Sequence, residues 1–245
     1  FNIDKWQAGQ LQLSQVATSI SLDNSIITLD PIKADFYQGT FSGNALINMQ
    51  QQVPNYTIDA KLTNTQIDGI IDDLSGKQYF SGKANISAKL QSKGLDQTEF
   101  LQNLNGMTSM TVQDGKLISL DFGKDISNVL AMAQSKKSET FDAFDQLKIN
   151  SNIKQGKAKI NAKLTAPNYK ASGKGNVNLV QQTINLSLEA YYTQSKQTRN
   201  IAIPITIAGP LENPTVTVST DEIITQALGS KGNGQLNNLI SGFFS

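Results

Sequence analysis

Apolar and polar residues alternate along short segments through most of this chain, and one alternating pentapeptide occurs three times. Its copies are residues 58–62 (IDAKL), 86–90 (ISAKL) and 160–164 (INAKL). In an extended strand, successive side chains point to opposite faces, so Ile, Ala and Leu share one face and the polar residues share the other. Each segment therefore predicts a strand with one wet face and one apolar face that something must cover.

About fourteen such segments follow one another with short turns between them. Short connections between successive strands favour an antiparallel meander. Asp114-Gly115 predicts a hairpin turn, and the Ser-Gly steps at Gly43, Gly82 and Gly173 predict bulges or bends. We expect a mainly β protein whose long curved antiparallel sheet forms an open groove, a half-pipe.

Helical patterns interrupt the strands in three places, near residues 65–75, 97–105 and 121–146. Thr65 and Asp68 have the spacing of a helix cap, and Asp96 with Glu99 has the pattern of a capping box. We expect these helices to cap or plug part of the groove. They are too few to cover the whole apolar face.

We expect the chain to divide into a β-groove domain at residues 1–228 and a flexible linker with an amphipathic tail at residues 229–245. The apolar residues of the tail recur at helical spacing and are Leu236, Leu239, Ile240, Phe243 and Phe244. A helix of about ten residues is too short to span a bilayer. We expect the tail either to dock on the core or to contact a membrane or a partner.

Composition excludes several classes of function. The chain contains no His and no Cys, so Ser-His-Asp and Cys-His nucleophilic sites are impossible and zinc loses its usual ligands. We therefore expect no catalytic residues, no metal site and no cofactor, and a protein that is not an enzyme. The net charge is only +1 and Arg199 is the single arginine, which argues against nucleic acid as a partner.

Membrane targeting is not visible in the sequence. No window approaches the roughly 20 apolar residues of a membrane-spanning helix, and no signal peptide stands at the start. We expect any export signal or membrane anchor to precede Phe1.

Several stretches, in this order, resemble the C-terminal region of the AsmA family of Gram-negative envelope proteins. They are residues 36–45 (FYQGTFSGNA), 101–106 (LQNLNG) leading to 112–117 (VQDGKL), and 203–214 (IPITIAGPLENP). The resemblance spreads over nearly the whole chain, and Ser119 departs from it where the family is expected to have glycine. It implies a periplasmic protein, anchored in the inner membrane by an upstream helix and related to TamB-type and bridge-like lipid transfer proteins.

Two functions stay open at this point. The first is a lipid-binding or lipid-transfer groove that supports outer-membrane biogenesis by moving phospholipid, or another acyl-chain lipid, between the two membranes. The alternative is a non-enzymatic scaffold or chaperone-like protein for outer-membrane assembly, which acts through contacts with an envelope protein partner. The predicted lipid-facing residues are Ile58, Ala60, Leu62, Ile86, Ala88, Leu90, Ile160, Ala162, Leu164, Ile184, Leu186 and Leu188.

Overall fold

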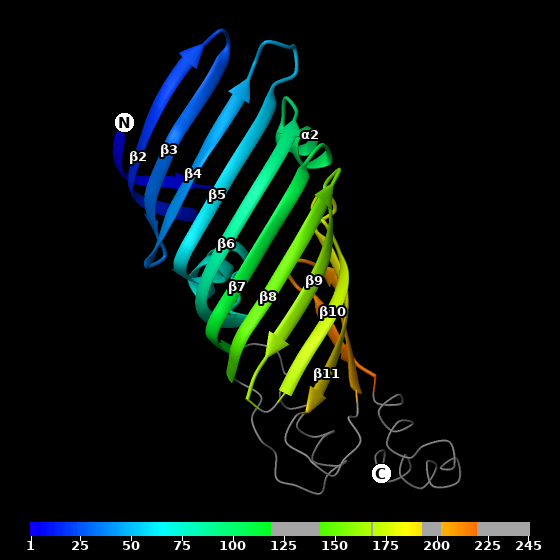
Figure 1. The fold of residues 1–245 in the computed structure, drawn as a ribbon. Helices are drawn as coiled ribbons and strands as arrows, with labels where there is room; N and C mark the ends of the chain where they lie inside the picture. The colour runs from blue at the N-terminus through cyan, green and yellow to red at the C-terminus, as the bar shows by residue number, and fades with distance from the viewer. Residues whose placement is uncertain (119–142, 168, 193–201, 220–245) are drawn as a thin grey trace, which may run out of the picture.

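A computed structural model describes residues 1–118, 143–167, 169–192 and 202–219 of the chain. These residues form one 13-stranded antiparallel sheet in which each strand pairs with its neighbours in sequence (Figure 1). The strands β1 and β13 are its two edges, so the described sheet is open. The predicted long curved antiparallel sheet is confirmed.

The strands are β1 (Asn2–Ala8), β2 (Leu11–Asp23), β3 (Ile26–Phe36), β4 (Gly39–Asn48), β5 (Asn55–Gln66), β6 (Phe80–Lys93), β7 (Asn105–Leu117), β8 (Ala143–Lys154), β9 (Lys157–Thr165), β10 (Tyr169–Asn178), β11 (Thr183–Tyr192), β12 (Ala202–Pro210) and β13 (Thr215–Val218). The three pentapeptides lie in β5, β6 and β9. Most turns between successive strands are short, which is why sequence order equals spatial order.

Two helices interrupt the described part of the meander, α1 (Ile67–Ser75) and α2 (Gln97–Gln102). The capping box of α2 is confirmed. The Asp96 carboxylate accepts a hydrogen bond from the backbone N of Glu99 at 2.8 Å, and the Glu99 carboxylate accepts one from the backbone N of Leu95 at 2.9 Å.

The predicted cap of α1 is wrong. Thr65 belongs to β5 and pairs with Ala84 of β6, and its hydroxyl is buried without a hydrogen-bond partner. The N-cap residue is Gln66, whose side chain makes no capping bond. Pairing with β6 keeps Thr65 extended inside the sheet, so its side chain is not placed at the helix start.

The third predicted helix, near residues 121–146, lies mostly outside the described residues. Its last positions are described, and they are strand, because β8 begins at Ala143. The amphipathic tail at residues 229–245 also lies outside the described part of the chain.

Asp114-Gly115 does not form the predicted hairpin turn. Strand β7 continues through both residues, since Gln113 and Gly115 both pair with β8. Asp114 has a φ of 50°, Gly82 on β6 has a φ of 138°, and the register between β6 and β7 shifts at this point. Asp114 and Gly82 therefore form a β-bulge, as predicted for Gly82.

The Ser-Gly step at Gly173 is not a bulge, whereas Gly43 lies beside a register shift between β3 and β4, which falls between Leu29 and Ile32. Gly43 pairs in regular register with Ala60, and Gly173 pairs with Ala162. A Cβ at Gly43 would lie 2.4 Å from the carbonyl oxygen of Asp59, and a Cβ at Gly173 would lie 2.1 Å from a backbone carbonyl oxygen of β11. These glycines stand where a neighbouring strand leaves no space for a side chain.

The C-terminal strands curl back behind the middle of the sheet (Figure 1). The connection between α1 and β6 meets the turn between β12 and β13 through two hydrogen bonds. The Tyr79 hydroxyl donates to the Glu212 carbonyl oxygen at 3.0 Å, and the Lys77 ammonium donates to Asn213 Oδ1 at 2.6 Å. The strands from β6 to β13 therefore surround a common interior.

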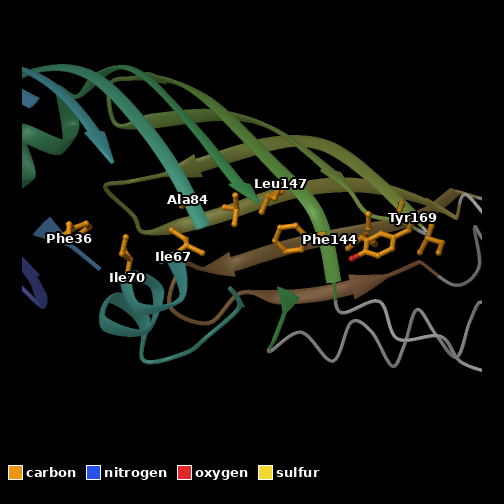
Figure 2. Close-up of a cluster of buried hydrophobic side chains, with 12 residues drawn as sticks. Phe36, Ile67, Ile70, Ala84, Phe144, Leu147 and Tyr169 are labelled. Carbon is orange, nitrogen blue, oxygen red and sulfur yellow. The ribbon is translucent and has the colours of Figure 1, made fainter. Parts of the chain in front are cut away.

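That interior holds a cluster of buried side chains, here called the α1 cluster (Figure 2). Its members come from α1, from strands on both sides of the curl and from the β9–β10 turn, and Figure 2 shows Ile67, Phe144 and Tyr169 among them. They are Phe36, Ile67, Ile70, Ala84, Val112, Phe144, Leu147, Ala166, Tyr169, Ala190, Ile203 and Ile205. A second group, here called the α2 cluster, contains Leu104, Ile153 and Ala158, with Phe100 and Leu101 packed against it.

Candidate functional site: an apolar inner face

The two faces of the sheet differ sharply in polarity. We call the face that carries Ala60, Ala88 and Ala162 the inner face, because side chains of this face from β6–β8 and from β11–β12 pack together in the α1 cluster. The opposite, outer face carries the lysines and asparagines that alternate with them. Strand alternation in the sequence sets this division.

Residues of the inner face line up across the strands in three continuous rows, because directly opposite residues in neighbouring strands share a face. The first row is Ile20, Leu29, Ala45, Ile58, Leu90, Gly106, Ile153, Ala158, Val177, Ile184 and Gly209. The second row is Ile32, Gly43, Ala60, Ala88, Thr108, Ser151, Ile160, Gly175, Leu186, Ile207 and Val216. The third row is Ala34, Phe41, Leu62, Ile86, Met110, Ile149, Ala162, Gly173, Leu188, Ile205 and Val218.

The rows are long and carry no charge. With about 4.8 Å between neighbouring strands, the first row extends roughly 48 Å along the sheet from β2 to β12. One leaflet of bilayer hydrocarbon is about 15 Å thick, half of the roughly 30 Å core. The first row is therefore about three times as long as the hydrocarbon of one leaflet is thick.

The predicted lipid-facing residues fall on this one face. Eleven of the twelve lie in the three rows, and Leu164 lies one position beyond the third row, opposite Leu147. All twelve are half-buried, neither enclosed in the core nor fully exposed. Their contact with lipid stays a prediction, as does the role of the tail residues, which lie outside the described part of the chain.

The two buried clusters divide these twelve residues by position along the strands. Leu62, Ile86, Leu164 and Leu188 pack against the α1 cluster, and Leu90 and Ile160 pack against the α2 cluster. Six belong to neither cluster, and they are Ile58, Ala60, Ala88, Ala162, Ile184 and Leu186. The α1 cluster thus lies toward the third-row end of the strands and the α2 cluster toward the first-row end, and three of the six residues in neither cluster, Ala60, Ala88 and Leu186, lie on the second, middle row.

The N-terminal strands extend the apolar face into solvent. Ile20, on the first row, is 47% exposed, and Leu22, on the same face of β2, is 68% exposed. Apolar-polar alternation in residues 20–22 is typical of a strand, but alternation alone does not indicate that its apolar side chains stay uncovered. They form an open end to the inner face.

Thr108 and Ser151 are the only polar residues in the three rows, and the alternating pattern of the sequence does not indicate a role for them. They lie opposite each other on β7 and β8, and their hydroxyl oxygens are 2.6 Å apart. The two hydroxyls therefore share a hydrogen bond, and neither is left without a partner in the second row. Periodicity alone does not place two distant hydroxyls opposite each other.

Helix α1 is held against the sheet by Tyr37, which follows β3. Its hydroxyl donates a hydrogen bond to the Asp73 carboxylate, and its ring packs edge-on against Phe36 at a centroid distance of 4.6 Å. Burial, together with the hydrogen bond and the negative charge of Asp73, raises the pKa of Tyr37 to about 12. The pair keeps α1 in place beside the α1 cluster.

The described residues offer no grouping of acidic side chains suited to a metal ion. Neither described helix has the length and hydrophobicity to span a bilayer. The chemistry of the inner face is therefore that of an uncharged apolar surface.

Comparison with known proteins identifies the class. The AsmA family matches residues 1–164, from β1 almost to the end of β9, and the chain belongs to the AsmA family. No curated protein and no solved structure matches the chain significantly. The matched stretch includes both described helices and the first nine strands of the sheet.

Proposed function

We propose that this protein binds the acyl chains of phospholipids along the middle of its inner face and carries them between the two membranes of a Gram-negative envelope. The observation that carries the proposal is the set of three uncharged rows that cross the sheet from β2 and β3 to β12 and β13. Membership of the AsmA family supports the proposal, since it suggests a role in outer-membrane assembly or lipid transport.

The physical basis is burial of methylene groups. Each methylene moved from water to an apolar surface gains about 0.8 kcal/mol, so a chain of ten buried methylenes gains about 8 kcal/mol before the cost of ordering it. Small residues at the centre, Gly43, Ala60 and Ala88, leave room beside the sheet for such a chain. The rows hold no charged group that would select one head group, so we expect broad lipid selectivity.

We place the protein in the periplasm, joined to the inner membrane by a segment upstream of this chain, and we assign it no enzymatic activity. Its working partners are then phospholipid and the two membranes. The absence of His and Cys supports a binding role over a catalytic one.

Native mass spectrometry of the purified chain tests lipid binding. Ala88→Glu puts a carboxylate in the second row, and Ser87→Glu puts the same group on the outer face one residue away. We expect bound phospholipid in the parent protein and in Ser87→Glu, and a loss of at least tenfold in Ala88→Glu. Ala88→Trp, which fills the same space without a charge, should also lose lipid, and circular dichroism verifies the fold of each variant. Equal lipid occupancy in all four proteins contradicts the proposal.

A scaffold is the second candidate, and one observation favours it: the α1 and α2 clusters already lie toward the two strand ends of the inner face. In that case the remaining rows only complete the core, and function resides in contacts with an envelope protein. The same mass spectra distinguish the two candidates, since a scaffold is free of lipid as purified and remains so after incubation with phospholipid.

A further inference from the structure

The lysines of the outer face gather on three neighbouring strands, although the net charge of the chain is only +1. Residues 143–178 contain seven lysines and one acidic residue, Asp145, whereas residues 1–118 contain eight lysines and eleven acidic residues. The seven are Lys148, Lys154, Lys157, Lys159, Lys163, Lys170 and Lys174, and all are exposed. We call this surface of β8, β9 and β10 the lysine face.

The strand register concentrates these charges where they repel one another. Lys148 lies directly opposite Lys163, and Lys154 lies directly opposite Lys157. Like charges in directly opposite positions destabilise a sheet. No lysine of this face pairs with an acidic group among the described residues, whereas Lys89 of β6 does pair with Asp59, at 3.5 Å. The fold therefore retains a repulsive arrangement that an anionic partner would relieve.

The borders of the lysine face leave its field uncancelled. Most outward positions of β7 beside it are uncharged, namely Asn105, Met107, Ser109, Thr111 and Gln113, and the end of the strand carries one exposed carboxylate, Asp114, and one exposed lysine, Lys116. On the other side, β11 contributes one carboxylate, Glu189, which accepts a hydrogen bond from the Tyr191 hydroxyl at 2.7 Å. The positive field thus extends over three strands with a single acidic neighbour on β11.

The surface also has space for head groups. A shallow hollow of about 410 Å³ lies over β9, β10 and β11, and its polar lining includes Lys159, Lys174, Asn161, Asn185 and Ser187. Ammonium, amide and hydroxyl groups can all donate hydrogen bonds to phosphate oxygens. The hollow therefore suits the phosphate of a lipid head group.

The residue types favour a bilayer over a protein or a nucleic acid. Apart from the exposed Asp145 near the start of β8, the outward positions of β8–β10 contain lysine, asparagine, glutamine, serine and threonine, with no arginine and no aromatic residue. Protein interfaces concentrate their binding energy in Trp, Tyr and Arg, and single-stranded nucleic acid sites use stacked aromatics. Flexible, strongly hydrated lysines instead respond to the diffuse potential of an anionic surface.

We propose that the lysine face is a docking surface for an anionic phospholipid bilayer, which would hold the sheet against a membrane by its outer face. This role goes beyond acyl-chain binding, because it needs no contact with the inner face. Each lysine near an anionic bilayer strengthens binding by about fivefold, so removing three should weaken it by about 100-fold.

Vesicle co-sedimentation of the whole chain tests the docking surface. The test variant carries Lys148→Gln, Lys163→Gln and Lys174→Gln, and its matched control carries Lys33→Gln, Lys61→Gln and Lys83→Gln on β3, β5 and β6. Both lose three charges, so only the position of the charges differs. Vesicles of phosphatidylcholine alone are compared with vesicles that also contain phosphatidylglycerol, in low and in high NaCl.

We expect the parent protein to bind the anionic vesicles more tightly than the neutral ones, and high salt to remove the difference. The test variant should lose about 100-fold in affinity and the control less than about threefold. Equal losses in both variants, or equal binding of the parent to both vesicles, would overturn the proposal. Binding to polyglutamate without binding to anionic vesicles would also overturn it and indicate an acidic protein partner. Ala88→Glu should leave docking unchanged, so failure of the lipid-binding proposal would remain distinguishable.

Discussion

Phe144 offers the sharpest test of which parts of the apolar face are filled by the protein itself. It stands near the start of β8 at 2% exposure, inside the α1 cluster. Opposite it lies Gly115 of β7, where a Cβ would be only 2.1 Å from the Phe144 ring. The ring therefore occupies the space that the glycine leaves, and Phe144→Ala would empty that space.

The expected cost follows from this packing. Replacing a fully buried Phe by Ala costs about 3–5 kcal/mol of unfolding free energy, because the transfer energy of the ring is lost and a cavity remains. Phe41, on the third row, provides a matched control, since it undergoes the same chemical change from a half-buried position. Its replacement should cost about 1–2 kcal/mol, since part of the ring already contacts solvent.

Urea unfolding of the whole chain, followed by circular dichroism, measures both values. With an m-value of about 3 kcal/mol per M, Phe144→Ala should lower the urea midpoint by about 1–1.7 M and Phe41→Ala by about 0.3–0.7 M. Equal costs for the two substitutions would refute the reasoning, because the centre of the α1 cluster would then be no better packed than Phe41, which lies at its margin.

In a double-mutant cycle, Thr108→Val and Ser151→Ala should show a coupling energy of about 1 kcal/mol, because each single substitution leaves one hydroxyl unpaired. Urea unfolding measures the free energies of the cycle. Additive costs of the two substitutions would contradict the pairing. The pKa of Tyr37 is about 12 in the folded protein, against an ordinary value of 10. The hydrogen bond to Asp73 should therefore stabilise the folded protein in full below pH 10, and by less as the pH rises to 12. The difference in urea midpoint between the parent and Tyr37→Phe should therefore shrink over that range, and a constant difference would contradict the assignment. Asp96→Ala should cost about 1 kcal/mol in thermal unfolding by removing the α2 cap, whereas an unchanged melting temperature would show that the cap contributes nothing.

The sheet and its two faces were predictable because alternation is a local signal. Ala60, Ala88 and Ala162 each stand at the centre of an apolar-polar pentapeptide, and strand geometry alone puts all three on one face. The same is true of α2, where Asp96 and Glu99 are three residues apart and cap the helix without help from distant residues.

The errors arose where strand pairing overrides a local pattern. Thr65 has a capping sequence, yet it stays extended because it pairs with β6. Asp114-Gly115 has a turn sequence, yet β7 continues because β8 pairs on both sides of it. In each case neighbouring strands supply backbone hydrogen bonds that the short motif does not encode.

The curl of the C-terminal strands was not predictable for a different reason. The hydrogen bond from Tyr79 to Glu212 joins residues 133 positions apart, and no periodicity in either segment indicates the other. The pairing of Thr108 with Ser151 and the gathering of lysines on β8–β10 likewise depend on strand register. The middle of the inner face could therefore be located only from the assembled sheet.

Photo-crosslinking at adjacent positions of β5 tests the central claim most directly. A photoreactive residue is placed at Ile58, on the first row and in neither buried cluster, or at Thr57, on the outer face. After irradiation with phospholipid, mass spectrometry of the purified protein should find lipid adducts at position 58 and at least tenfold fewer at position 57. Equal adducts at the two positions, or none at position 58, would contradict the account that the inner face carries lipid.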